Sequence, residues 1–254
     1  MNVEDIFLDY VADYLNDSEL CKYKVDHSFR VRDIAIEIGK SLNLSSKDLA
    51  LLNICGILHD IGRFEQYRRY KTFVDSDCVS HCNIGYDVLS DGIIFDKLRL
   101  DSVEREIVLC AVLNHGALKV DDSVVGKKKK FVDIIMDADK LDILNNAVLE
   151  NISLNIGDDA ISDAIYKNIF DHEIVNLNKK VSRADRICIW FGFVFGLHFL
   201  YSFEHLNNHN IIPRLSEIYR NKTCNTECKS QILKIEDEIN NYIKSKINEG
   251  EIVC

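Results

Sequence analysis

The segment from Cys55 to Arg63 reads CGILHDIGR and places a histidine directly before an aspartate at the end of an apolar run. Residues three, four or seven apart share one face of a helix, so the apolar stripe through Cys55 continues to His59. Asp60 follows one step around the helix. An unpaired carboxylate in a protein core is costly unless a partner or a cation neutralises it. The doublet therefore indicates a buried functional site rather than ordinary core packing.

The same test finds more polar residues that extend apolar stripes, on four further helices. They are His27, His81, His115 and Asp139. Any one histidine on an apolar face is more often a hydrogen-bonded core residue than a ligand. Four histidines and two aspartates placed inward together favour a shared metal site, because imidazole and carboxylate are good ligands and a cation removes the penalty of burying carboxylates.

This set resembles the H...HD...D signature of the HD superfamily of metal-dependent phosphohydrolases, over about residues 25 to 145. The segments HSFRV, LHDIGR and DADKLD, at His27, at the doublet and at Asp139, carry the resemblance. In that family the signature residues bind a metal ion, and branches with two extra histidines hold a second ion. His81 in HCNIGYDVL and His115 in VLNHG stand in the order of those extra ligands. The resemblance thus implies a binuclear site bridged by Asp60.

The sequence matches individual branches of the HD superfamily less well than it matches the superfamily as a whole. HDIGRFEQYRRY and DADKLDIL are most similar to a small, poorly characterised bacterial branch, from which no substrate carries over. The Gly-Tyr-Pro segment of the cyclic-dinucleotide phosphodiesterase branch has no counterpart here, because the single proline, Pro213, follows an isoleucine.

The activity implied is hydrolysis of a small phosphoester or nucleotide by a metal-activated hydroxide, since bound metal lowers the pKa of water from near 16 toward about 7. Asp60, Arg63 and Lys140 are the predicted catalytic residues. Arg63 is the first candidate for a phosphate clamp, because guanidinium binds phosphate in a bidentate manner. Lys140 is the second, and Arg30, Arg68 and Arg69 follow. One or two divalent ions are expected, and iron or manganese suits an imidazole-rich site better than magnesium, with zinc, nickel and magnesium open.

Three alternatives stay open. Some histidine-rich members of the superfamily hold two irons and activate oxygen on a small organic substrate, and an HD core can also serve as a non-catalytic sensor or scaffold. Hydrolysis predicts release of phosphate or nucleotide without oxygen, whereas the oxygenase function predicts oxygen consumption. Within the hydrolase, His81 and His115 could contact the substrate phosphate instead of a second ion.

Helices must position these residues. Of the 254 residues 47% are apolar and one is proline, and apolar residues recur three and four apart, which predicts an all-α fold. We expect an HD-domain helical bundle, a single domain over residues 1–254 with its core at about 20–150 and a C-terminal helical extension at about 155–254. Predicted helices span about 3–15, 26–42, 46–60, 77–91, 102–115, 130–153, 159–170, 183–206, 214–222 and 229–247.

Charge and composition limit the partners and the compartment. A net charge of -10 argues against a broad nucleic-acid surface, and Lys127–Lys130 is either a solvated loop flank or a basic lip for an anionic substrate. The start, MNVEDIFLDY, lacks the features of a signal peptide, so a cytoplasmic location is expected. The apolar run 187–203 is interpreted as a buried helix rather than a membrane span.

Nine cysteines in a chain of this size favour reduced thiols over disulfides. Cys78 and Cys82 lie one helical turn apart, as do Cys224 and Cys228. Neither pair supplies the four convergent ligands of structural zinc, so all are interpreted as plain thiols.

Overall fold

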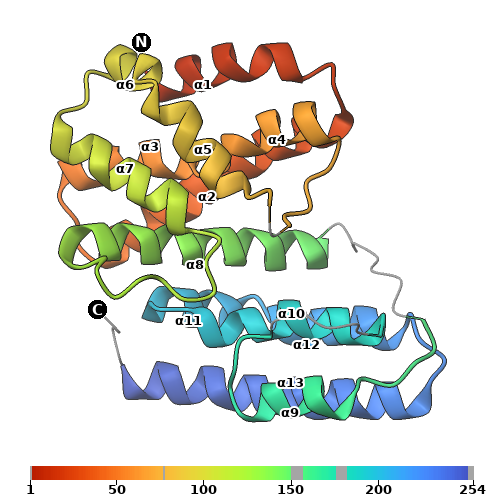
Figure 1. The fold of residues 1–254 in the computed structure, drawn as a ribbon. Coiled ribbons are helices and arrows are strands. Elements are labelled where there is room, and N and C mark those ends of the chain that lie inside the picture. Colours follow the sequence, from red (N-terminus) through yellow and green to blue (C-terminus); the bar gives the residue numbers. More distant parts are fainter. Residues whose placement is uncertain (1, 77, 150–156, 176–181, 251–254) are drawn as a thin grey trace. The chain divides into compact units, whose positions relative to one another are not determined.

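The computed structural model describes residues 2–76, 78–149, 157–175 and 182–250, drawn in Figure 1. Over these ranges the regular structure is helical and no strand occurs, which confirms the all-α prediction; one isolated antiparallel bridge joins Ser76 and Val79. The chain divides into two compact units, residues 1–139 and 140–254. The predicted start of the C-terminal extension, about residue 155, lies outside the described residues. The single-domain interpretation stays a prediction.

The first unit contains the helices that carry the predicted site residues. Helix α2 packs along α3, and α5 packs between α4 and α7. Several of these helices begin after a residue whose side chain accepts a hydrogen bond from a free backbone amide. These N-cap residues are Ser18 for α2, Ser45 for α3 and Asp101 for α7. The elements are α1 Val3–Val11, η1 Ala12–Tyr14, α2 Glu19–Ser41, α3 Ser46–Leu58, α4 Gly62–Tyr70, α5 His81–Ser90, α6 Ile93–Leu98, α7 Ser102–Asn114 and the first part of α8 Gly126–Leu149.

Two glycines on either side of the His-Asp doublet allow close helix packing. A Cβ atom at Gly56 would lie 2.6 Å from the Cα of Arg32 on α2, and one at Gly62 would lie 2.1 Å from the carbonyl oxygen of His81 on α5. Real side chains do not approach backbone so closely. Because glycine has no Cβ, α3 can lie close against α2, and the start of α4 can lie close against the start of α5.

Several predicted boundaries differ from those of the structure. The helix expected over 46–60 ends at Leu58, and Gly62, where the sequence suggested a stop, begins the unpredicted helix α4. The single helix expected over 183–206 is interrupted at Gly192 and Gly196, after which Leu197 adopts an extended conformation. Helix α6 was also not predicted.

Helix α8 starts at Gly126, before the predicted residue 130, so the lysine run forms its first turn rather than a loop flank. Lys127 pairs with Asp48, Lys128 with Glu106 and Lys129 with Asp133. These ion pairs connect the lysine run to α3, to α7 and to the next turn of α8. A role as a basic lip for substrate stays a prediction.

The second unit packs around the last helix, α13, which buries isoleucines at helical spacing, namely Ile232, Ile235, Ile239 and Ile243, and contacts α11 and α12. None of the described helices has the length and apolar character needed to cross a membrane. The eight cysteines within the described ranges form no disulfide. Besides the end of α8, the elements are α9 Asp163–Phe170, η2 Ala184–Arg186, α10 Ile187–Gly192, η3 Phe193–Gly196, α11 Leu200–Asn208, α12 Ile211–Arg220 and α13 Thr226–Glu249.

Candidate metal centre

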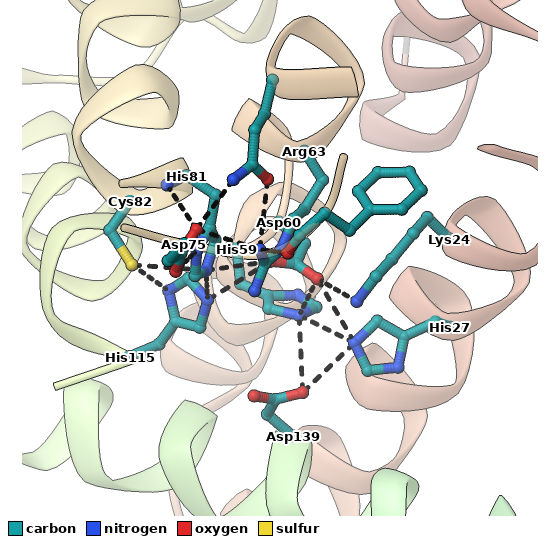
Figure 2. Close-up of polar contacts among 12 residues, drawn as sticks. Lys24, His27, His59, Asp60, Arg63, Asp75, His81, Cys82, His115 and Asp139 are labelled. Atoms are coloured by element: carbon teal, nitrogen blue, oxygen red, sulfur yellow. Dashed lines mark hydrogen bonds and ion pairs between the residues drawn. The ribbon is translucent and has the colours of Figure 1, made fainter. Parts of the chain in front are cut away.

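The six predicted ligands lie together in the first unit, as Figure 2 shows. They come from five segments of the chain: α2, the turn after α3, the start of α5, the end of α7 and α8. All are buried except Asp139, whose side chain keeps 20% of its surface exposed. The residues are His27, His59, Asp60, His81, His115 and Asp139.

One cluster is formed by the four residues of the H...HD...D pattern. The Nε2 atom of His27 lies 3.1 Å from Asp139 Oδ1 and 3.3 Å from His59 Nε2. The Oδ2 atom of Asp60 is 3.5 Å from His27 Nε2 and 3.7 Å from His59 Nε2. Two nitrogens and two oxygens thus face one small volume.

A second cluster lies on the other side of Asp60. The Nε2 atoms of His81 and His115 are 3.1 Å apart. Each also faces the remaining carboxylate oxygen, Asp60 Oδ1, at 3.3 Å from His81 and 3.4 Å from His115. One aspartate therefore presents one oxygen to each histidine pair.

Hydrogen bonds on the outer face of three rings orient their Nε2 atoms inward. His59 Nδ1 lies 2.8 Å from the Gly56 carbonyl oxygen, and His115 Nδ1 lies 2.9 Å from that of Val112. A carbonyl only accepts, so these Nδ1 atoms carry the proton and, in the neutral ring, Nε2 carries the lone pair. His81 Nδ1 lies 2.6 Å from Asp75 Oδ2. A partner of this kind is the usual support of a metal-binding histidine.

Burial and neighbouring charges set the protonation states. Burial lowers the pKa of His59 to about 3, so this ring is neutral at pH 7. Burial alone would raise the pKa of Asp60, but Lys24 and Arg63 outweigh it and hold that pKa well below the usual range. Burial opposes ionisation of Asp139 too, but the hydrogen bond from His27 lowers its pKa. Both carboxyl groups are ionised at neutral pH.

Three residues of this centre were not predicted from the sequence. Lys24 places Nζ 2.7 Å from Asp60 Oδ2, and it stands three residues before His27, a spacing that marks a shared helix face. Asp75 lies in the loop before α5, where no periodicity indicates its role. Cys82 follows His81, and its Sγ atom lies 3.4 Å from His81 Nε2.

Arg63 lies beside the centre and is held by several partners. Its Nη1 donates to the carbonyl oxygen of Phe73 at 2.6 Å and to Asp75 Oδ1 at 3.1 Å, and its Nε lies 3.4 Å from Asp60 Oδ1. These contacts fix the loop that carries Asp75. The phosphate-clamp role of Arg63 stays a prediction.

The other predicted basic residues have partners elsewhere. Lys140 belongs to the second unit and donates to the Gly196 carbonyl oxygen at 3.0 Å. Arg68 and Arg69 are exposed and pair with Asp17 and Glu65. The Arg30 guanidinium lies 5.5 Å from the centre of the Tyr23 ring.

The residues fit divalent metal ions on two observations. Asp60 Oδ1 is buried and accepts no hydrogen bond, which is costly for a carboxylate oxygen. The Nε2 atoms of His81 and His115, whose Nδ1 atoms both have partners, converge at 3.1 Å, and their lone pairs repel each other unless a proton or a cation lies between them. A cation at each cluster would satisfy the orphaned oxygen and the lone pairs together, and imidazole-rich sets favour transition metals.

Comparison with known proteins agrees with this geometry. The family model described as HD domain matches residues 25–189. No curated protein and no solved structure matches the chain.

Proposed function

The chain belongs to the HD domain family, which consists mostly of metal-dependent hydrolases, and from that premise we propose that it hydrolyses a small phosphoester or nucleotide. The observation that carries the proposal is Asp60, whose two oxygens face two separate histidine pairs. This arrangement supports two neighbouring cations, which suit in-line displacement at phosphorus.

The ligand roles follow from the two clusters. His27, His59, Asp139 and Asp60 Oδ2 would hold one ion, and His81, His115 and Asp60 Oδ1 would hold the other. When bound, such ions supply an acidified water and offset the negative charge of the phosphoryl transition state.

Two basic side chains add positive charge beside the candidate metal centre. Lys24 and Arg63 both contact the carboxylate of Asp60. The Lys24 ammonium ends a flexible stem and can move from Asp60 to a phosphate oxygen once cations neutralise the carboxylate. Arg63 has less freedom, because Phe73 and Asp75 hold its guanidinium. We therefore assign Lys24 to phosphate binding and Arg63 to positioning of the loop before α5.

A direct test strips the protein of metal, reloads it with Mn²⁺, Fe²⁺ or Zn²⁺, and measures phosphate release from a panel of phosphoesters and nucleotides, with an oxygen electrode in parallel. Hydrolysis should require metal and fall at least about 100-fold in Asp60→Asn. Asp87→Asn, at an exposed position of α5, is the matched control and should keep full activity. Metal-dependent oxygen consumption without phosphate release would contradict the proposed hydrolase function and favour the oxygenase function.

A further inference from the structure

Cys82 lies at the edge of the second histidine cluster, beside His81 and His115, as Figure 2 shows. It is the second residue of α5, its side chain is buried, and its Sγ atom lies 3.4 Å from His81 Nε2 and 3.8 Å from His115 Nδ1. One ligating atom from each of His81, Cys82 and His115 can be chosen so that all lie within 4.8 Å of one another. The thiol thus belongs to this cluster and not to a pair with Cys78.

The separations of three ligand atoms from His81 Nε2 match those around a four-coordinate ion. Bonds of about 2.0 to 2.3 Å to nitrogen, oxygen and sulfur place tetrahedral ligands about 3.3 to 3.6 Å apart. The His81 Nε2 atom lies 3.1 Å from His115 Nε2, 3.3 Å from Asp60 Oδ1 and 3.4 Å from Cys82 Sγ. All three separations are close to the edges of such a tetrahedron.

A separate observation points to a cation at the same place. Asp60 Oδ1 is buried, accepts no hydrogen bond and faces His81 and His115. Two nitrogens and this oxygen leave one position of a tetrahedral ion to fill, and the thiol of Cys82, 3.4 Å from His81 Nε2, is a ligand of the right kind to fill it.

The backbone leaves room for the thiol. A Cβ atom at Gly116, the residue after His115, would lie 3.2 Å from Cys82 Sγ and 3.3 Å from His81 Cε1. A larger residue would press on both side chains at once. The absence of a side chain at Gly116 therefore leaves space for the sulfur and the imidazole.

We propose that Cys82 is a thiolate ligand of the ion held by His81, His115 and Asp60, an inference that rests on the metal centre of the proposed function. Coordination replaces the S–H bond by a metal–sulfur bond and releases one proton to solvent. The two positions then differ in chemistry, because the cluster of His27, His59 and Asp139 offers nitrogen and oxygen only. Sulfur favours zinc or iron(II) over manganese at the second position.

Cobalt(II) tests this inference through its absorption spectrum. A cobalt–thiolate bond gives an intense charge-transfer band in the near ultraviolet, which nitrogen and oxygen ligands do not give. The band should appear in the metal-stripped, cobalt-loaded protein, persist in Cys78→Ser and vanish in Cys82→Ser. Cys78 is the matched control because it is an exposed thiol four residues away. A band that survives in Cys82→Ser overturns the proposal.

X-ray absorption on the zinc-loaded, unsubstituted protein gives a measurement that needs no variant. An average of one sulfur neighbour for every two zinc ions, at about 2.3 Å, supports the proposal even if Cys82→Ser does not fold. Two bound ions with no sulfur neighbour overturn it, leave the proposed hydrolase intact and make Cys82 a hydrogen-bonding neighbour of His81. A protein that binds no metal defeats the proposed function and this inference together.

Discussion

His81 and His115 hold their Nε2 atoms 3.1 Å apart, although the Nδ1 atom of each ring already has its own partner. Burial lowers the pKa of His115, but Cys82 and Asp60 outweigh it and raise that pKa well above the usual value. The raised pKa keeps a proton on His115 in the metal-free protein. A cation at this position would replace it, and the geometry of the pair is already that of two ligands on one ion.

The first prediction concerns metal stoichiometry. Stripped protein reloaded with excess Zn²⁺ should hold two ions per chain, the His81→Ala/His115→Ala double variant about one, and Asp60→Ala none, because Asp60 faces both clusters. Elemental analysis after desalting measures this, and His209→Ala, at an exposed histidine, should keep both ions. Saturation of the unsubstituted protein at one ion would make His81 and His115 substrate contacts instead.

The second prediction separates the charge of Lys24 from its packing. Lys24→Met should lower the free energy of unfolding of the metal-free protein by about 2 kcal/mol, since it leaves the buried Asp60 carboxylate with less compensation. The loss should be smaller in the metal-loaded protein, where cations neutralise Asp60. Urea unfolding of both forms measures it. Lys22→Met, which removes only a surface pair with Glu19, should cost at most about 0.5 kcal/mol; equal losses in both forms of Lys24→Met would contradict the reasoning.

The third prediction concerns support of a ligand by Asp75. Burial opposes ionisation of this carboxyl, but its hydrogen bond to His81 lowers the pKa to about 2, so it is charged at neutral pH. Asp75→Asn should weaken binding of the second ion about 10- to 100-fold and leave the first unchanged. A chelator competition titration resolves the two affinities, with Asp87→Asn as the control. Equal weakening of both ions would show a general disturbance of the fold.

The fourth prediction concerns the contact between α4 and α5. Gly62→Ala should lower stability by about 3 kcal/mol, because its Cβ would meet backbone, namely the His81 carbonyl at 2.1 Å and the Gly85 nitrogen at 2.4 Å. Gly39→Ala is the comparison, since its Cβ would meet only the movable ends of leucine side chains. Thermal unfolding should show a clear loss for Gly62→Ala and a small one for Gly39→Ala. Equal midpoints for the two variants would refute the argument.

The fifth prediction concerns pH and the second unit. Burial lowers the pKa of His205 to about 4, and His209, stacked on it, adds to the effect. The unfolded chain takes up a proton near pH 6.5 while the folded chain resists it down to about pH 4, so stability is full above pH 6.5 and falls as the pH drops through that window. Between pH 7 and pH 5 the protonation of this residue should lower the free energy of unfolding by about 1 kcal/mol, after allowance for its partial exposure. His205→Gln should flatten the pH dependence of urea unfolding, and an unchanged slope would contradict it.

Helical periodicity was enough to identify the residues that meet at the centre, because His27, His59 and Asp139 each continue an apolar stripe. It did not reveal Asp75, since a loop has no repeat that indicates where its side chains point. Cys82 was missed for a different reason. One helical step separates it from His81, which suggests another face, but the first turn of α5 lies so near His115 that both side chains reach it.

Glycine misled the prediction of boundaries because it can end one helix and equally begin the next. Gly62 was interpreted as a stop, yet it is the start of α4, and the reason is a neighbour nineteen residues later, the carbonyl of His81. Gly192 and Gly196 were treated as part of one apolar helix, but α10 ends at Gly192, a short 3-10 helix ends at Gly196, and Leu197 is extended. Contacts distant in sequence decide such cases.

Gly56 limits how this centre could be transferred to another scaffold. The Cβ of any other residue would lie 2.6 Å from the Cα of Arg32, so the distance between α2 and α3 is one that only a bare Cα hydrogen permits. His59 reaches His27 across that distance. A designer who grafts the His-Asp doublet onto a helical bundle must therefore set the spacing of the two backbones before choosing ligands, and a search for hidden copies of the motif gains from requiring glycine three residues before the histidine.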